Sequence, residues 1–227
     1  MKKILWKISS LWTICSNPRK VLGKKEDLTS SYFSSVKTFD YQKSREPVFS
    51  DDYGQYFGLK ESQVMRVDDK DIYLCDNHNK ILVPLFHAYS SLKRPLHIVH
   101  IDAHRDDALF LKEKPKYFNE ESLRYLLSET RISDFFDALS ETGVIKTINR
   151  YTESESYLSD KEVSCDVLSL DIDIFGPEGD FVDLESKIKT IARFWNKVPV
   201  VCIAMSPGFI DQDYAREIIK IFLKKGT

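Results

Sequence analysis

The sequence predicts an α/β fold in which a mainly parallel sheet is covered by helices. Strand-like apolar runs alternate with helix-periodic segments through the second half of the 227-residue chain, an order typical of parallel sheets. The composition is 42% hydrophobic and 30% charged, as in globular chains of average usage. A chain of this length can bury one substantial core. We therefore expect a three-layer α/β/α sandwich.

The elements follow from the spacing of apolar residues. Apolar side chains three or four residues apart predict helices, and continuous or alternating apolar runs predict strands. In chain order we expect a hairpin of residues 64–67 and 72–75, a helix over 81–89, a strand over 96–101, a helix over 132–139, strands over 144–148 and 163–174, a helix over 184–195, a strand over 198–204 and a helix over 210–223. Residues 107–125 are polar and are expected to be irregular.

The chain divides by charge into a basic N-terminal extension, residues 1–45, and a body, residues 46–227. The extension carries ten Lys or Arg and three Asp or Glu, whereas the body carries 23 and 32. Apolar residues between Ile4 and Trp12 are at helical spacing, and we expect this short helix to pack on the body rather than to anchor a membrane.

Charge, hydropathy and cysteine content exclude several classes of protein. The net charge is −2, which gives no reason to expect a nucleic-acid partner. No run reaches the roughly 18 apolar residues of a membrane span. The four cysteines are scattered, which indicates a reducing compartment rather than a disulfide framework. We expect a cytoplasmic protein with no membrane partner.

Polar chemistry gathers where two predicted strands end. The strand over 96–101 runs into Asp102, His104 and Asp106, and the strand over 163–174 contains Asp171 and Asp173. Residues two apart on a strand share a face, and α/β proteins bind ligands at the carboxyl ends of their strands. Two buried like charges repel each other. A divalent cation would relieve that repulsion.

A third imidazole, His78, stands between a predicted strand and a predicted helix. The candidate metal ligands are thus His78, Asp102, His104, Asp106, Asp171 and Asp173. The set contains no thiolate, which argues against a structural zinc site; carboxylates with imidazoles suit manganese, and also iron, cobalt or zinc. Four carboxylates can neutralise two divalent ions. The remaining histidines, His87, His97 and His100, are expected to be structural.

Three of these segments resemble the metal motifs of arginases and agmatinases, the ureohydrolase superfamily. Residues 102–106, D-A-H-R-D, resemble the motif D-A-H-x-D, and residues 169–177 resemble S-x-D-x-D-x-x-D-P. Asn77 and His78 stand where the superfamily has G-G-D-H. The resemblance implies an arginase-like fold and two Mn²⁺ ions. It implies that His78, Asp102, Asp106 and Asp171 hold one ion, that Asp102, His104, Asp171 and Asp173 hold the other, and that Asp102 and Asp171 bridge them.

The departures from that pattern point to a peptide substrate. Gly176 stands where enzymes of free arginine carry Asp, and Ala204 where the superfamily has its guanidinium-binding Glu. No histidine follows His104, so the segment that binds the amino-acid end of free arginine is absent. The chain is more similar to the ureohydrolase-like peptide arginases, with which it shares S-P-G-F at residues 206–209.

That resemblance implies an enzyme of ribosomal peptide maturation. A metal-bridging hydroxide would attack the guanidinium carbon of an arginine side chain in a precursor peptide, with or without a leader peptide, to give urea and ornithine. Asp173 is the expected proton relay. Asp211 either caps the last helix or accepts the guanidinium, and Glu178 and Asp180 are further candidate acceptors. The alternatives are an agmatinase-, formiminohydrolase- or deacetylase-like dinuclear hydrolase, and a non-catalytic, metal-stabilised peptide-binding protein.

Overall fold

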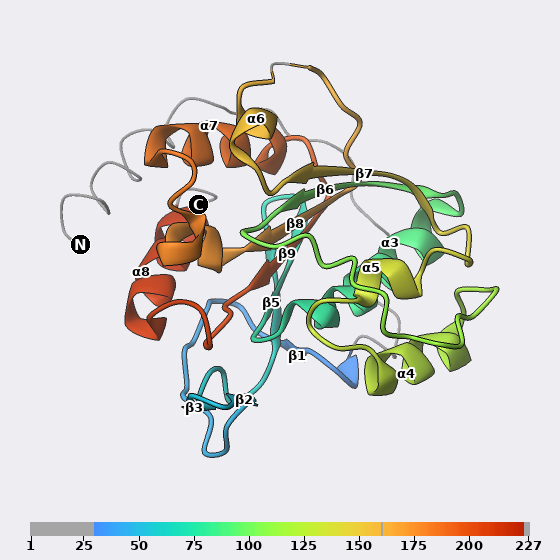
Figure 1. Ribbon diagram of the computed structural model, residues 1–227, viewed down its shortest axis with the longest axis horizontal. Helices are drawn as coiled ribbons and strands as arrows, with labels where there is room; N and C mark the ends of the chain where they lie inside the picture. The colour runs from blue at the N-terminus through green and yellow to red at the C-terminus, as the bar shows by residue number, and fades with distance from the viewer. Residues whose placement is uncertain (1–29, 160, 225–227) are drawn as a thin grey trace.

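The computed structural model describes residues 30–159 and 161–224. It contains a seven-stranded sheet of order β1-β4-β5-β9-β8-β6-β7 (Figure 1). Its strands are β1 (Ser34–Ser35), β4 (Gln63–Val67), β5 (Lys70–Cys75), β6 (Leu96–Ile101), β7 (Ile145–Tyr151), β8 (Val167–Asp171) and β9 (Val200–Ala204). All neighbouring pairs are parallel except the β4–β5 hairpin. The predicted α/β class with a mainly parallel sheet is therefore confirmed.

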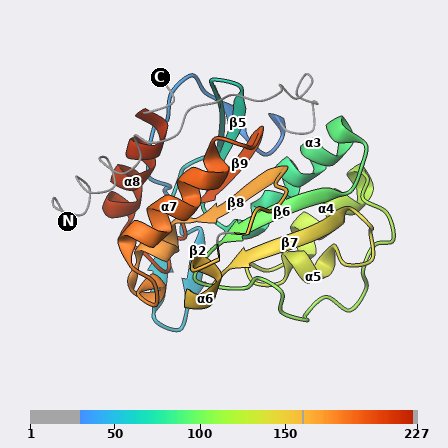
Figure 2. The same cartoon turned by 90° about the horizontal axis from the view of Figure 1, so that it is seen from above.

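Helices connect the parallel strands and pack against the sheet. They are α3 (Leu82–Leu92), α4 (Glu120–Glu129), α5 (Phe135–Ala138), α6 (Ser154–Tyr157), α7 (Leu184–Trp195) and α8 (Gln212–Lys224). Figure 2 shows α7 and α8 on one side of the strands and α3, α4 and α5 on the other. Among the described residues, no helix has the length and apolar character needed to cross a bilayer.

Each face of the sheet has its own hydrophobic core. Leu168 of β8 packs with Ile188 of α7 and Phe222 of α8 in one buried cluster. Its neighbour Val167 belongs to a second cluster, with Leu85 of α3 and other residues. This alternation follows from the two-residue period of a strand. Because both faces are covered, the central strands are apolar along their whole length.

The β4–β5 hairpin is confirmed, and its turn explains the polar residues at its tip. Gln63 pairs with Leu74 and Val67 pairs with Lys70. Asp68 has a φ of 52°, in the left-handed region that Asp tolerates better than most residues. A second ribbon, formed by β2 (Phe49–Asp51) and β3 (Gly54–Tyr56), is a separate antiparallel sheet that projects from the body (Figure 1).

The predicted strand over 163–174 is wrong after Asp171. There the chain turns into a short 3-10 helix, Ile172–Phe175. The Asp171 side chain accepts a hydrogen bond from the Asp173 N–H at 3.0 Å, and such a local bond competes with the sheet ladder. Asp171 and Asp173 are therefore brought together by a turn and not by strand alternation.

Two helices also differ from the prediction. The helix expected over 132–139 is limited to α5, and the polar stretch 107–125 contains the start of α4. The α4 start is a reciprocal cap: Asn119 Oδ1 accepts from Ser122 N–H, and Ser122 Oγ accepts from Asn119 N–H, both at 2.9 Å. Such a cap contributes about 1 kcal/mol to helix stability.

The described part of the N-terminal extension joins the body directly. Phe33 is buried, and Ser34 pairs with Gln63 of β4. Val36 and Phe39 pack against the core that contains α7 and α8. The sheet thus begins before residue 46. The short helix predicted between Ile4 and Trp12 lies outside the described residues.

Candidate metal centre

All six predicted ligands lie together where the central parallel strands end. His78 begins a 3-10 turn, His78–Ile81, after β5; Asp102 follows β6; and Asp171 ends β8. Most of the ligands line a cavity of about 290 Å³. Because the carboxyl ends of parallel strands meet at one edge of a sheet, residues far apart in the sequence share this cavity.

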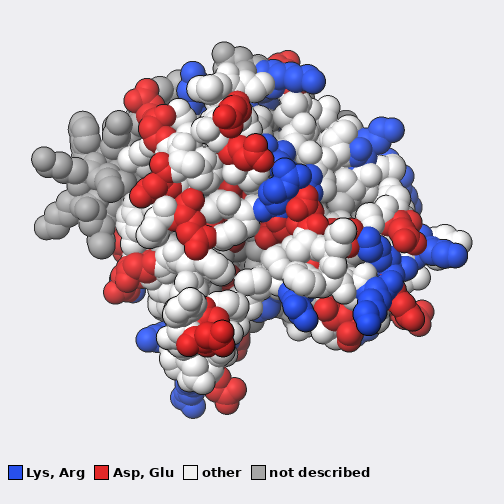
Figure 3. Space-filling model, viewed as in Figure 1, with Lys and Arg blue, Asp and Glu red and all other residues white. Residues whose placement is uncertain are grey.

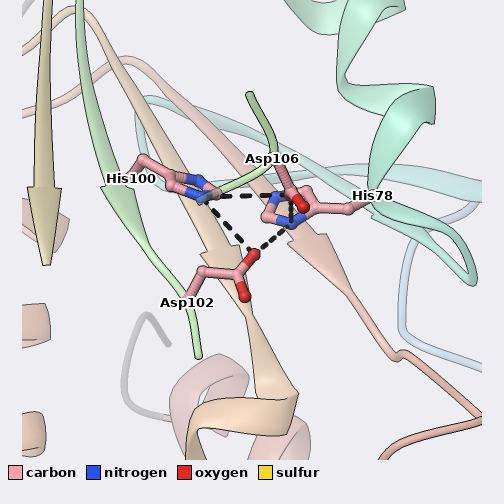
Figure 4. A group of neighbouring side chains, drawn as sticks. All are labelled: His78, His100, Asp102 and Asp106. Atoms are coloured by element: carbon pink, nitrogen blue, oxygen red, sulfur yellow. Dashed lines mark hydrogen bonds and ion pairs between the residues drawn. The ribbon is translucent and has the colours of Figure 1, made fainter. Parts of the chain in front are cut away.

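The first group of side chains surrounds His78 (Figure 4). Its Nδ1 lies 2.8 Å from Asp102 Oδ2, 3.2 Å from Asp106 Oδ2 and 3.3 Å from Asp171 Oδ2. All four side chains are buried. One N–H cannot donate well to three carboxylates, so this corner of the site has more acceptors than donors.

The second group surrounds His104 and shares Asp102 with the first. His104 Nδ1 lies 3.3 Å from Asp102 Oδ1 and 3.0 Å from Asp173 Oδ2. On the other side of the ring, His104 Nε2 lies 2.5 Å from Glu178 Oε2. A carboxylate at the second ring nitrogen is the usual outer partner of a metal-ligating histidine.

Backbone geometry folds the loop after β6 back on itself. Asp106 has a φ of 51°, and its carbonyl accepts a hydrogen bond from Phe136 N–H at 3.3 Å. Ser206, after β9, also has a positive φ, 43°, and its Oγ donates to Asp171 Oδ2 at 2.5 Å. These two unusual residues position carboxylates, which is where backbone strain is commonly found.

The electrostatics of the site show an excess of buried negative charge. Burial, followed by the charge of Asp102, raises the pKa of Asp106 to about 7. Burial, followed by the charges of Asp171 and Asp102, raises the pKa of Asp173 well above its ordinary value. Hydrogen bonds to Asp102 and Asp173 raise the pKa of His104 to about 11. These shifts all indicate that extra positive charge is favoured here.

The donor set fits a divalent cation. Among the described side chains, Asp106 Oδ2 and Asp173 Oδ2 are buried and accept no hydrogen bond. One ligand atom from each of His78, His100, Asp102 and Asp106 lies within 4.8 Å of the others, as do ligand atoms of Asp102, His104 and Asp173. Metal–ligand bonds of roughly 2.0–2.2 Å place opposite ligands about 4 Å apart. A cation in each group would therefore need only small adjustments.

His100 belongs to this network, although the sequence reading made it an ordinary core histidine. It is completely buried, and burial lowers its pKa to about 3, so its ring is neutral. Its Nε2 lies 3.1 Å from the His104 carbonyl oxygen and its Nδ1 lies 3.2 Å from Ser169 Oγ. The two-residue spacing of His100, Asp102 and His104 is the signal that could have found it.

The other histidines set aside from the site lie elsewhere. His97 Nδ1 lies 2.9 Å from Thr147 Oγ1 on the neighbouring strand, and His87 is buried within α3.

The candidate guanidinium acceptors are distributed differently from the ligands. Asp211 accepts from Tyr214 N–H at 2.8 Å at the start of α8 and is not among the residues that line the cavity. Asp180 is exposed, whereas Glu178 contacts His104. The cavity-lining carboxylate outside the predicted ligand set is Asp107.

Asp107 already has cationic partners. It lies 3.1 Å from Arg105 Nη2 and 3.5 Å from Arg150 Nη2. Acidic and basic side chains also lie next to one another across this face of the molecule (Figure 3). The mouth of the cavity therefore carries both signs of charge.

Apolar side chains form the rest of the cavity wall. Phe49 comes from the β2–β3 ribbon, and Phe209 from the loop after β9. Their ring centroids are 5.8 Å apart, and the Phe209 ring lies 5.1 Å from that of His104. The Asn77 side chain donates to the Val48 carbonyl at 3.0 Å, which ties the ribbon to the segment that carries His78.

Comparison with known proteins gives no relative for this chain: no family model, no curated protein and no solved structure matches it.

Proposed function

We propose that this chain is a metal-dependent hydrolase that converts arginine side chains of a peptide to ornithine and releases urea. The observation that carries the proposal is the convergence of six ligand side chains into two groups that share Asp102. The resemblance of three segments to ureohydrolase metal motifs supports the choice of reaction. We place the reaction in the cytoplasm, in the maturation of ribosomal peptides.

The six side chains would hold two divalent ions, with Mn²⁺ as the first candidate. His78 and Asp106 would serve one ion, His104 and Asp173 the other, and Asp102 would serve both. Asp171 Oδ2, 3.3 Å from His78 Nδ1, would be the second shared carboxylate. Two bound ions of this kind lower the pKa of water to near neutrality and so supply a nucleophile for C–N hydrolysis.

The chain's own residues would orient the substrate and move protons. Asp173 Oδ2 is buried beside His104 Nδ1 and accepts no hydrogen bond, so it is placed to hold a proton and pass it to the leaving amine. Phe49 and Phe209 would pack on the methylene stem of an arginine side chain and exclude water. A cavity of about 290 Å³ suits one side chain, and a peptide main chain would lie outside its mouth.

One observation favours a second candidate, a dinuclear hydrolase of another C–N bond. The carboxylate expected to accept a guanidinium, Asp211, is placed at the α8 cap, and Asp107 is paired with two arginines. A substrate without a strong cationic group, such as the amide of a deacetylase-like reaction, would not need a free carboxylate. Agmatinase- and formiminohydrolase-like reactions fall in the same class of candidates.

The test is an assay of products with the Mn²⁺-loaded protein. Arginine-containing peptides, free arginine, agmatine, formimino compounds and acetylated amines are incubated in parallel, and urea, ornithine, formamide, ammonia and acetate are measured. Urea with peptidyl ornithine supports the proposal, and Asp173→Asn should reduce turnover by more than tenfold with metal still bound. Urea from free arginine but none from peptides would contradict it, and so would metal loading with peptide binding and no turnover.

A further inference from the structure

A chain of hydrogen-bonding groups runs behind His78, away from the carboxylates. His78 Nε2 lies 2.7 Å from Ser169 Oγ. The same hydroxyl lies 3.2 Å from His100 Nδ1, and His100 Nε2 lies 3.1 Å from the carbonyl oxygen of His104. Ser169 and His100 have no exposed surface and His78 is also buried. The four groups therefore satisfy one another without solvent.

The last member of the chain determines the direction of every hydrogen bond in it. A carbonyl oxygen only accepts, so His100 Nε2 carries the proton. Full burial, with the edge of Phe136 against the ring at 4.9 Å, favours a neutral imidazole with a single N–H. His100 Nδ1 is then an acceptor, and the Ser169 hydroxyl must donate to it.

The consequence reaches the cluster through Ser169. A hydroxyl has one proton, and here that proton is committed to His100. Ser169 Oγ can therefore only accept from His78 Nε2, which must carry an N–H. We infer that Ser169 and His100 form a one-way hydrogen-bond chain that holds the Nδ1 lone pair of His78 toward Asp102 and Asp106, where a divalent cation would bind.

Ser169 and His100 are thus positioning residues that act through His78. His100 contributes orientation and not a metal bond, although its Nε2 lies only 3.5 Å from Asp102 Oδ2. The inference rests on the metal site of the proposed function, but it does not depend on the substrate. Outer partners of metal-ligating histidines typically change metal affinity by about 10–100-fold.

The first experiment measures Mn²⁺ affinity by calorimetry in four variants. His100→Phe keeps the ring volume beside Phe136 but removes the acceptor, so the Ser169 hydroxyl is free to donate to His78 Nε2 and to favour the wrong tautomer. We expect about 10–100-fold weaker binding in His100→Phe and in Ser169→Ala. Because the two residues act in series, the double variant should bind no more weakly than His100→Phe alone. His97→Phe, on the same strand but outside the chain, is the matched control and should bind as the wild type does.

The second experiment needs no variant and covers the case in which a variant fails to fold. Nitrogen chemical shifts of the histidine rings are recorded in the Zn²⁺-loaded wild-type protein. We expect a metal-bound Nδ1 and a protonated Nε2 in His78, with an unbound ring protonated at Nε2 in His100. A metal-bound His100, or a His78 ring ligated through Nε2, would overturn the inference.

The outcomes separate this inference from the proposed function. Wild-type protein that binds neither Mn²⁺ nor Zn²⁺ would remove the metal site and both proposals with it. Wild-type affinity in folded Ser169→Ala and His100→Phe would overturn only the hydrogen-bond chain. Folding of each variant is checked by circular dichroism of the metal-free protein.

Discussion

The sharing of Asp102 between the two ligand groups makes metal binding countable. Asp102 Oδ2 contacts His78 in one group and Asp102 Oδ1 contacts His104 in the other. Asp102→Ala should therefore remove both ions, and His104→Ala only one. At a free Mn²⁺ concentration of 100 times the dissociation constant, each ion adds about 2.7 kcal/mol to the free energy of unfolding. At roughly 2–4 °C per kcal/mol for a chain of this size, two ions raise the melting temperature by roughly 10–20 °C.

The assay is differential scanning fluorimetry with and without Mn²⁺, paired with elemental analysis of the dialysed protein. Each variant is compared with its own chelator-treated form, so that changes in metal-free stability cancel. We expect two ions and the full shift for the wild type, one ion and about half the shift for His104→Ala, and neither for Asp102→Ala. An equal shift in the wild type and Asp102→Ala would refute the shared-carboxylate reasoning, as would a wild-type stoichiometry of one.

Two further predictions concern a buried acid and the cavity mouth. Burial raises the pKa of Asp76 from 3.8 to about 6, so its ionisation costs stability as pH rises through this range. Asp76→Asn keeps an oxygen that can accept from Leu59 N–H and cannot ionise; by denaturant unfolding of metal-free protein its advantage should grow from zero near pH 4 to roughly 3 kcal/mol at most by pH 7, and a constant difference would contradict this. A Cβ on Gly208 would lie 2.7 Å from the Phe49 ring, so Gly208→Ala should displace that ring, raise KM by severalfold and leave metal stoichiometry unchanged; unaltered kinetics would show that Phe49 does not contact the substrate.

The general position of the site was predictable because strand order and motif spacing both point to it. Asp102, His104 and Asp106 follow an apolar strand, and the carboxyl ends of parallel strands meet at one edge. The helix α7 was predicted at its observed bounds because its apolar residues have clean helical spacing. These features depend on local pattern, and local pattern is what a single sequence carries.

The features that were missed depend on side chains bonding to particular backbone groups. The turn between Asp171 and Asp173 comes from a side-chain acceptor within an apolar run that otherwise looks like a strand. The α4 cap arises from Asn119 in a segment too polar to show periodicity. His100 looks like any buried histidine until Ser169, 69 residues later, is placed beside it. Only the folded chain supplies such partners.

The position of β9 in the sheet has a consequence for biosynthesis. This strand is among the last elements of the chain, yet it lies between β5 and β8 at the centre of the sheet. During translation, β5 must therefore wait for residues 200–204 to emerge before its parallel partner exists. Ser206, which donates to Asp171, emerges later still. The complete ligand set is thus assembled only when synthesis is nearly finished, and metal uptake belongs to the released protein rather than to the nascent chain.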